Sequence, residues 1–197
     1  MNDKSLDDTG FTALDIETTG LSARYCGIVE IAALKELPDG SVESFQTLVD
    51  PQMLIPEDVI AIHGITNEMV RGKPIAQEAV ERLVEFVGES PLVIHNAKFD
   101  LGFLTPLVMD LGLKWGSPVV FDTVRLSKRA FPRLTSYSLE NLSRHFGFEK
   151  GKHHRALADC YYCARLFHLV LDELDISDMT ISWIARRYGE TQFLLGR

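Results

Sequence analysis

Acidic residues at the end of a predicted strand are the first feature of the sequence that could perform chemistry. Asp15 and Glu17 stand two positions apart in the segment FTALDIE at 11–17. Alternation along this segment predicts a strand that carries both carboxylates on one face near its end. Like charges this close repel each other, so a bound cation would explain the pair; an acidic pair in open solvent is the alternative. The turn TTGL at 18–21 could expose backbone N–H groups to a phosphate.

Two further acidic residues come from segments far along the chain. Asp100 ends the sequence HNAKFD that begins at His95, and Asp159 ends the sequence HRALAD that begins at His154. Asn96 could cap a helix that contains Asp100. Asp159 falls within a mostly apolar helix, where a buried carboxylate needs a partner such as a metal ion. Taken alone, Asp100 is also explained as an ordinary acidic residue at a helix start.

Together these segments supply four carboxylates and an imidazole. Hard oxygen donors of this kind suit Mg²⁺ or Mn²⁺ better than zinc. Two such ions would stabilise both the attacking and the leaving oxygen of a phosphodiester displacement. His154, as an imidazole with an ordinary pKa of about 6.5, could accept a proton from the attacking water at neutral pH. The chemistry that this set of residues predicts is phosphodiester hydrolysis.

The elements expected around these residues predict one mixed α/β domain. Three strand-like runs joined by short turns indicate an antiparallel meander, and the strands that follow alternate with helices, which favours parallel β-α units. We expect strands at 11–17, 28–36, 43–50, 91–95 and 118–122. We expect helices at 74–88, 97–113, 123–130, 138–146 and 156–174, and a last one capped by Ser177 or Asp178 that runs to Tyr188. Pro106 should kink or interrupt the second helix, and 51–73 should form a loop.

Composition and charge limit the class of protein. With 197 residues, of which 46% are hydrophobic and 24% charged, one globular domain is expected. The sequence has no apolar run of membrane-spanning length and no signal-peptide core, and its three cysteines indicate reduced thiols, so we expect a cytoplasmic protein without membrane contact. The net charge is −8, but 121–156 hold eight Lys or Arg against three Asp or Glu, a local balance of +5. This basic segment could attract a polyanion, and solvated helix faces would explain it equally well.

Five motifs, in order over about Thr12 to Leu171, resemble the DEDDh 3′-to-5′ exonuclease family, which is DnaQ-like and includes the proofreading epsilon subunit of bacterial DNA polymerase III. The motifs are DIETTGL from Asp15, VEIA from Val29, HGIT from His63, HNAKFD from His95 and HRALAD from His154. The resemblance implies a ribonuclease H-like α/β fold. Its mixed five-stranded sheet has the order 3-2-1-4-5, with the first three strands antiparallel and helices on its flanks.

The resemblance also implies roles for individual residues. Two divalent ions, Mg²⁺ or Mn²⁺, would bind to Asp15, Glu17, Asp100 and Asp159, and His154 would be the general base. A sister class has a tyrosine four residues before the last aspartate, and that position here is Arg155. The implied substrate-binding residues are Thr18, Gly20, Leu21, His63, Asn96 and Phe99. Leu21 and Phe99 would wedge or stack against bases, and core packing is the alternative for both.

The expected activity is removal of nucleoside 5′-monophosphates from the 3′ ends of single-stranded DNA. An exoribonuclease of the same family is one alternative, and a catalytically silent nucleic-acid-binding module is another, although all five catalytic positions are filled. We expect a flexible N-terminus at 1–9, an exonuclease domain at 10–175 and a C-terminal helix within 176–197 packed on the same domain. The resemblance to the epsilon subunit makes a DNA polymerase subunit a candidate partner. Only about twenty residues follow the helix that ends near 174, so a freestanding nuclease is the alternative.

Three other polar residues are expected to have structural roles. Cys160 and Cys163 form a C-x-x-C pair whose spacing matches no common zinc module, so we interpret them as core thiols on a helix. Asp122 lies between a predicted strand and a predicted helix, and helix capping explains it without a ligand role.

Overall fold

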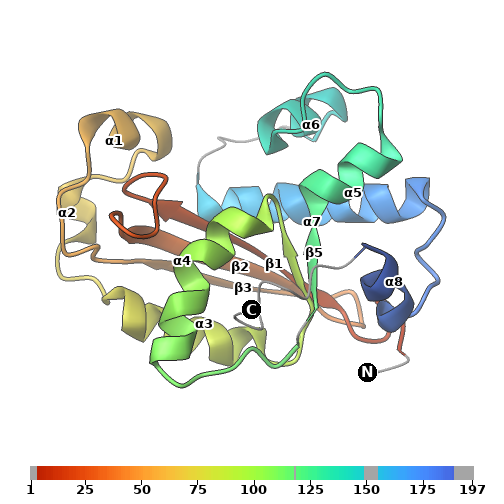
Figure 1. Ribbon diagram of the computed structural model, residues 1–197, viewed down its shortest axis with the longest axis horizontal. Helices are drawn as coiled ribbons and strands as arrows, with labels where there is room; N and C mark the ends of the chain where they lie inside the picture. The colour runs from red at the N-terminus through yellow and green to blue at the C-terminus, as the bar shows by residue number, and fades with distance from the viewer. Residues whose placement is uncertain (1–3, 118, 149–154, 189–197) are drawn as a thin grey trace.

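The computed structural model describes residues 4–117, 119–148 and 155–188. Within these residues the chain forms a five-stranded sheet in the order β3-β2-β1-β4-β5 (Figure 1). The strands are β1 Phe11–Thr18, β2 Ile28–Glu36, β3 Val42–Leu48, β4 Leu92–Ile94 and β5 Val120–Asp122. β1, β2 and β3 pair antiparallel, and β4 runs parallel to both β1 and β5. The expected ribonuclease H-like sheet is therefore confirmed.

Helices cover both faces of this sheet (Figure 1). α7 Ala156–Glu173 packs on one face, and α3 Ala76–Val87 and α4 Ala97–Asp110 pack on the other. The remaining described helices are α1 Glu57–His63, α2 Asn67–Val70, α5 Thr123–Ala130, α6 Leu139–His145 and α8 Ile181–Tyr188. Among the described helices, none is both long and apolar enough to cross a membrane.

Alternation along β1 distributes its side chains between two cores. Phe11 and Ala13 belong to the core under α7, where the Phe11 ring centroid lies 5.1 Å from that of Phe167. Leu14 and Ile16 belong to the core under α3 and α4. Because side chains alternate between the faces of a strand, the next two positions on the α7 face carry acidic residues. The hydrophobic pattern of one strand thus directs carboxylates toward the beginning of α7.

The segment at 51–73 corrects one expectation from the sequence. It was expected to be a loop, but it contains α1 and α2. Ile55, Ile65 and Val70 form a small core of their own with Val29 of β2. These buried residues are spread over short helices and their connections, so they show no helical period in the sequence. The absence of a period explains the wrong prediction.

Pro106 does not interrupt α4, one of the two outcomes expected for it, because the helix continues through it to Asp110. A proline inside a helix costs about 3 kcal/mol through the lost backbone hydrogen bond and a steric clash. Leu104 and Val108, on either side of the proline, are almost fully buried. Burial of both halves of the helix against the sheet offsets that cost.

The last helix begins later than expected. α8 starts at Ile181 rather than after Ser177 or Asp178, and the Trp183 N–H donates to Thr180 Oγ1 at 3.3 Å. At the other end of the chain, the Ile181 N–H donates to the Lys4 carbonyl at 2.9 Å, and Leu6 is buried in the core under α7. Ile184 of α8 belongs to the same core. The described part of the N-terminal segment therefore packs against α8.

Candidate active site

Three carboxylates from two segments that are distant in sequence meet at the end of β1. Asp15 and Glu17 are half-buried in the C-terminal half of β1, and Asp159 is buried in the first turn of α7. One oxygen from each of the three lies within 4.8 Å of the others. The sheet therefore brings together three of the four predicted metal ligands, in a group small enough to surround one cation.

Asp100, the fourth predicted ligand, is buried in the first turn of α4 beside this group. Its Oδ1 accepts a hydrogen bond from the Ile16 N–H at 3.2 Å, so it is held against β1 between the two acidic residues of that strand. One carboxylate oxygen is thus used for positioning. The negative charge of Asp100 nevertheless acts on Asp15, as the pKa of Asp15 shows.

The start of α4 corrects the expectation that Asn96 caps it. Asn96 precedes the helix with a left-handed backbone, φ 69°, and within the described residues its side chain makes no capping hydrogen bond. Asp122 Oδ2, at the end of β5, accepts from the Ala97 N–H at 3.0 Å instead. The other oxygen of Asp122 accepts from Val124 and Arg125, which confirms its expected role as the cap of α5. One residue therefore caps both helices.

The pKa values of the described carboxylates reflect their burial and their mutual repulsion. Burial, followed by the charge of Asp100, raises the pKa of Asp15 well above its ordinary value. Burial, followed by the charges of Asp159 and Glu30, raises the pKa of Glu17 to about 8. Burial likewise raises the pKa of Asp100. Such shifts mean that the carboxylates resist ionisation together, and a divalent cation with oxygen ligands would relieve this. The donor set fits Mg²⁺ or Mn²⁺.

A fifth carboxylate, Glu30, was not assigned a role from the sequence. It is fully buried on β2, directly opposite Glu17 in the antiparallel pair. Both of its oxygens bind Arg155, at 2.9 and 3.2 Å. The available signal was its place in the VEIA motif: an acidic residue in an otherwise apolar strand requires a buried partner.

His154, the predicted general base, lies outside the described residues. The next residue, Arg155, is described, and its contacts with Glu30 fix the end of the chain that leads into α7. Asp159 follows in the first turn of that helix.

The predicted substrate-binding turn is braced and leaves one apolar side chain in solvent. Thr18 is buried, and its hydroxyl donates to the Gly20 carbonyl at 2.7 Å. Thr19 Oγ1 accepts from the Gly27 N–H at 3.0 Å, which closes the loop between β1 and β2. Leu21 is 89% exposed, so core packing does not explain it. An exposed leucine on this hydrogen-bonded turn is available to contact a nucleotide base.

The other predicted contacts are partly or fully packed. His63 is buried at the end of α1, and its Nδ1 accepts from the Ile65 N–H at 3.0 Å. Phe99 packs partly on the core under α3 and α4, with its ring 5.3 Å from that of Phe103, and keeps part of its surface exposed. Core packing thus accounts for part of Phe99. Cys160 and Cys163 are buried in α7, which agrees with their interpretation as core thiols.

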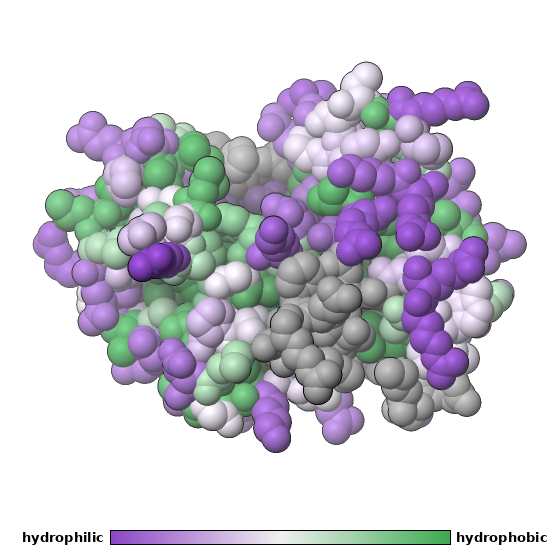
Figure 2. Space-filling model, in the orientation of Figure 1, coloured by the Kyte–Doolittle hydropathy of each residue, from purple (hydrophilic) through white to green (hydrophobic). Residues whose placement is uncertain are grey.

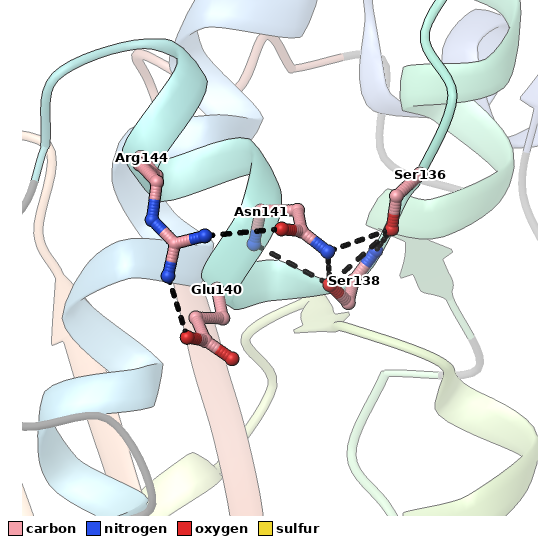
Figure 3. A network of polar contacts seen from close by, with 5 residues as sticks. All are labelled: Ser136, Ser138, Glu140, Asn141 and Arg144. Carbon is pink, nitrogen blue, oxygen red and sulfur yellow. Dashed lines mark hydrogen bonds and ion pairs between the residues drawn. The ribbon is translucent and has the colours of Figure 1, made fainter.

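The described part of the basic segment includes α5, α6 and the loop between them. Lys128 and Arg129 are exposed on α5, where Figure 2 shows a hydrophilic surface. On α6, Arg144 donates to Glu140 at 2.7 Å, beside a cluster of Ser136, Ser138 and Asn141 that caps the helix (Figure 3). An exposed ion pair of this kind contributes little to stability. These cations are accessible to a phosphate backbone.

Comparison with known proteins gives the class that this fold and site define. The exonuclease family of the RNase T type matches residues 12–167 of the chain. A ribonuclease H-like sheet with clustered carboxylates at the end of its first strand is the arrangement of a DnaQ-like nuclease. The chain belongs to the exonuclease family and is an exonuclease enzyme.

Individual relatives agree with this assignment. The DNA polymerase III subunit epsilon of Aquifex aeolicus is 35% identical over 175 residues, covering 88% of this chain and 86% of that protein. A PolC-type DNA polymerase III of Clostridium perfringens is 40% identical over 183 residues, but the match spans 90% of this chain and only 12% of that protein. The structure of exonuclease X in complex with 5′ overhanging duplex DNA is 30% identical with a TM-score of 0.65, covering 86% of this chain and 97% of that one.

Proposed function

We propose that this exonuclease hydrolyses the terminal phosphodiester bond at the 3′ end of single-stranded DNA and releases nucleoside 5′-monophosphates. The observation that carries the proposal is the convergence of Asp15, Glu17 and Asp159 within 4.8 Å, with Asp100 buried beside them. Carboxylates crowded in this way, with raised pKa values for Asp15 and Glu17, are suited to binding cations.

The four carboxylates would hold two divalent ions, Mg²⁺ or Mn²⁺. When bound, these ions would stabilise negative charge on the attacking and leaving oxygens. Asp100 uses one oxygen to hold β1, and its carboxylate would also serve the cation site. His154, five positions before Asp159, would accept the proton of the attacking water. The chain thus provides both the cation site and a group that can take a proton at neutral pH.

Features around the carboxylates support a nucleic-acid strand as substrate. Leu21 would contact a terminal base, and the exposed part of Phe99 would stack on a base, a contact that is independent of base identity. Thr18 and Gly20 would shape the turn that receives the substrate, while His63 and Asn96 would contact the bound DNA strand. The basic segment would attract the phosphates. The DNA complex of exonuclease X supports DNA rather than RNA.

A role in proofreading rests on a different observation. The chain matches most of an epsilon subunit of DNA polymerase III and a small part of a PolC-type polymerase. We therefore propose a DNA polymerase subunit as a partner in the cytoplasm. Co-purification with a polymerase subunit would support this role, while an active enzyme that binds no such subunit would indicate a freestanding nuclease.

The activity is tested with 5′-labelled single-stranded DNA and RNA of the same sequence, each with Mn²⁺, Mg²⁺ or EDTA. We expect a metal-dependent ladder that shortens from the 3′ end, faster on DNA. Asp159→Asn should abolish it, and Asp172→Asn, an exposed position on the same helix, should not. Faster cleavage of RNA would favour the exoribonuclease, and no cleavage by folded protein would favour a silent binding module.

A further inference from the structure

Glu30 makes an unusually complete set of contacts for a buried acidic residue. Oε1 accepts from Arg155 Nη2 and Gln46 Nε2, both at 2.9 Å. Oε2 accepts from Arg155 Nε at 3.2 Å and from the Ala156 N–H at 3.1 Å. A fully buried carboxylate is costly unless its lone pairs are satisfied, and these bonds satisfy both oxygens.

Glu30 lies between the two parts of the candidate site, which are the carboxylates of β1 and Asp159 of α7. It lies on the face of β2 that carries Ala32 and Leu34 into the core under α7. Across the sheet it is paired with Glu17 of β1. Across the layer it reaches the first residue of α7, whose first turn carries Asp159. Glu30 therefore connects β2, opposite one proposed ligand, with the helix that carries another.

Glu30 also caps the start of α7, where the described residue Arg155 makes no side-chain capping hydrogen bond. The residue before the helix, Arg155, has an extended backbone and turns its side chain to Glu30. The Glu30 carboxylate accepts the first N–H of the helix and places a negative charge at the positive end of the helix dipole. Arg155 binds both oxygens of Glu30 and so offsets part of the charge that this cap places beside the four carboxylates.

We propose that Glu30, through Arg155 and the start of α7, is a positioning residue that holds Asp159 and the chain adjoining His154 in register with Asp15 and Glu17. The proposal rests on the function proposed above and extends it. Glu30 contacts neither substrate nor cation in this role. Its loss should therefore alter cation affinity and turnover more than substrate binding.

The test compares the wild type with Glu30→Gln. The control variant is Glu43→Gln, because Glu43 is an exposed residue of β3, the strand next to β2. Glutamine keeps the shape of Glu30 but loses its charge. The free energy of unfolding is measured in EDTA, the Mn²⁺ dissociation constant by calorimetry, and kcat and KM on a short single-stranded DNA. We expect folded Glu30→Gln to bind Mn²⁺ about 10- to 100-fold more weakly and to show a lower kcat with KM nearly unchanged.

Several results would overturn the proposal. A folded Glu30→Gln with the Mn²⁺ affinity and kcat of the wild type would do so. If that variant does not fold, Arg155→Lys decides, because lysine keeps the charge without the bidentate geometry, and the Arg155 side chain is 42% exposed. Unchanged Mn²⁺ affinity and kcat in folded Arg155→Lys would count against positioning.

The two proposals fail in different ways. A wild type that binds Mn²⁺ but cleaves no DNA contradicts the proposed function, and positioning is then judged from the Mn²⁺ affinity of Glu30→Gln alone. An active wild type with an unaffected Glu30→Gln contradicts positioning alone. A wild type that binds no Mn²⁺ contradicts both.

Discussion

Carboxylate repulsion at the candidate site opposes folding when no cation is present. The raised pKa of Asp15 has burial as its main cause, followed by the charge of Asp100. We expect Asp15→Asn to raise the free energy of unfolding in EDTA by about 0.5–2 kcal/mol and to abolish turnover. Urea unfolding and the cleavage assay check both effects, with Asp110→Asn, an exposed position on α4, as control. Turnover at the wild-type rate would exclude Asp15 as a ligand.

Glu17 provides a pH dependence with a definite sign. Its folded pKa of about 8 exceeds the ordinary 4.5, so between these values the folded metal-free protein binds more protons than the unfolded chain. Stability in EDTA should therefore decrease as pH rises through this range. Mn²⁺ requires the ionised carboxylate, so its affinity should rise from pH 6 to 8 with proton release. Calorimetry at pH 7 in buffers of different ionisation enthalpy measures that release, which Glu17→Gln should reduce.

His154 is the residue whose proposed role depends on the sequence alone. We expect His154→Ala to lower kcat by roughly 10²- to 10⁴-fold, because a general base is lost, with a smaller loss of Mn²⁺ affinity. His153→Ala is the matched control, because His153 lacks the five-residue spacing to Asp159. Single-turnover cleavage measures the rate. Normal turnover in folded His154→Ala would remove the assignment.

At the scale of elements, His95 connects β4 with α5 and with the loop before α6. Its Nδ1 lies 2.8 Å from Thr123 Oγ1 and its Nε2 3.0 Å from the Tyr137 carbonyl, which requires a proton on Nε2. A neutral ring then accepts the Thr123 hydroxyl on Nδ1. Burial, only partly offset by the charge of Asp122, lowers the pKa of His95 to about 4. The basic segment is therefore attached to the sheet through a neutral histidine.

This histidine makes stability depend on pH in the opposite sense to Glu17. The unfolded chain protonates His95 below 6.5, and the folded protein only below about 4, so its contribution is complete above pH 6.5 and is lost as pH falls toward 4. The full loss is about 3 kcal/mol. We expect His95→Gln to be less stable than the wild type at pH 7, and the difference to shrink at pH 5. Urea unfolding at both pH values checks this, and a constant difference would contradict it.

At the scale of the whole molecule, charge is segregated. Residues 121–156 carry +5 and the chain carries −8, so the rest carries −13. If the basic segment binds phosphates, Arg144→Gln should weaken binding of a single-stranded oligonucleotide and lower the slope of log affinity against log salt by about 1. Lys114→Gln, an exposed position after α4, should change neither. Fluorescence anisotropy in the Asp159→Asn background measures the affinity and its salt dependence. If Arg144→Gln and Lys114→Gln have equal effects, the basic segment is a solvated surface that does not bind phosphates.

Local patterns in the sequence determined much of the architecture. A strand-like run bounded by turn residues predicted β2 at 28–36 with its observed bounds, and the helical pattern predicted α5 at 123–130. Alternation also predicted that Asp15 and Glu17 share a face with Phe11 and Ala13. Such patterns can be read from sequence because the face of a side chain depends only on the repeat of its own element.

Contacts between elements were decided by the tertiary structure. Asp122, rather than Asn96, caps α4, although it lies 25 residues away from Ala97. Glu30 reaches the first N–H of α7 across a separation of 126 residues. Neither contact leaves a local period, because each depends on strand order, on register and on where a helix crosses the sheet. The sequence by itself therefore determined which residues could do the chemistry, and packing of the sheet layers decided which other residues hold them in place.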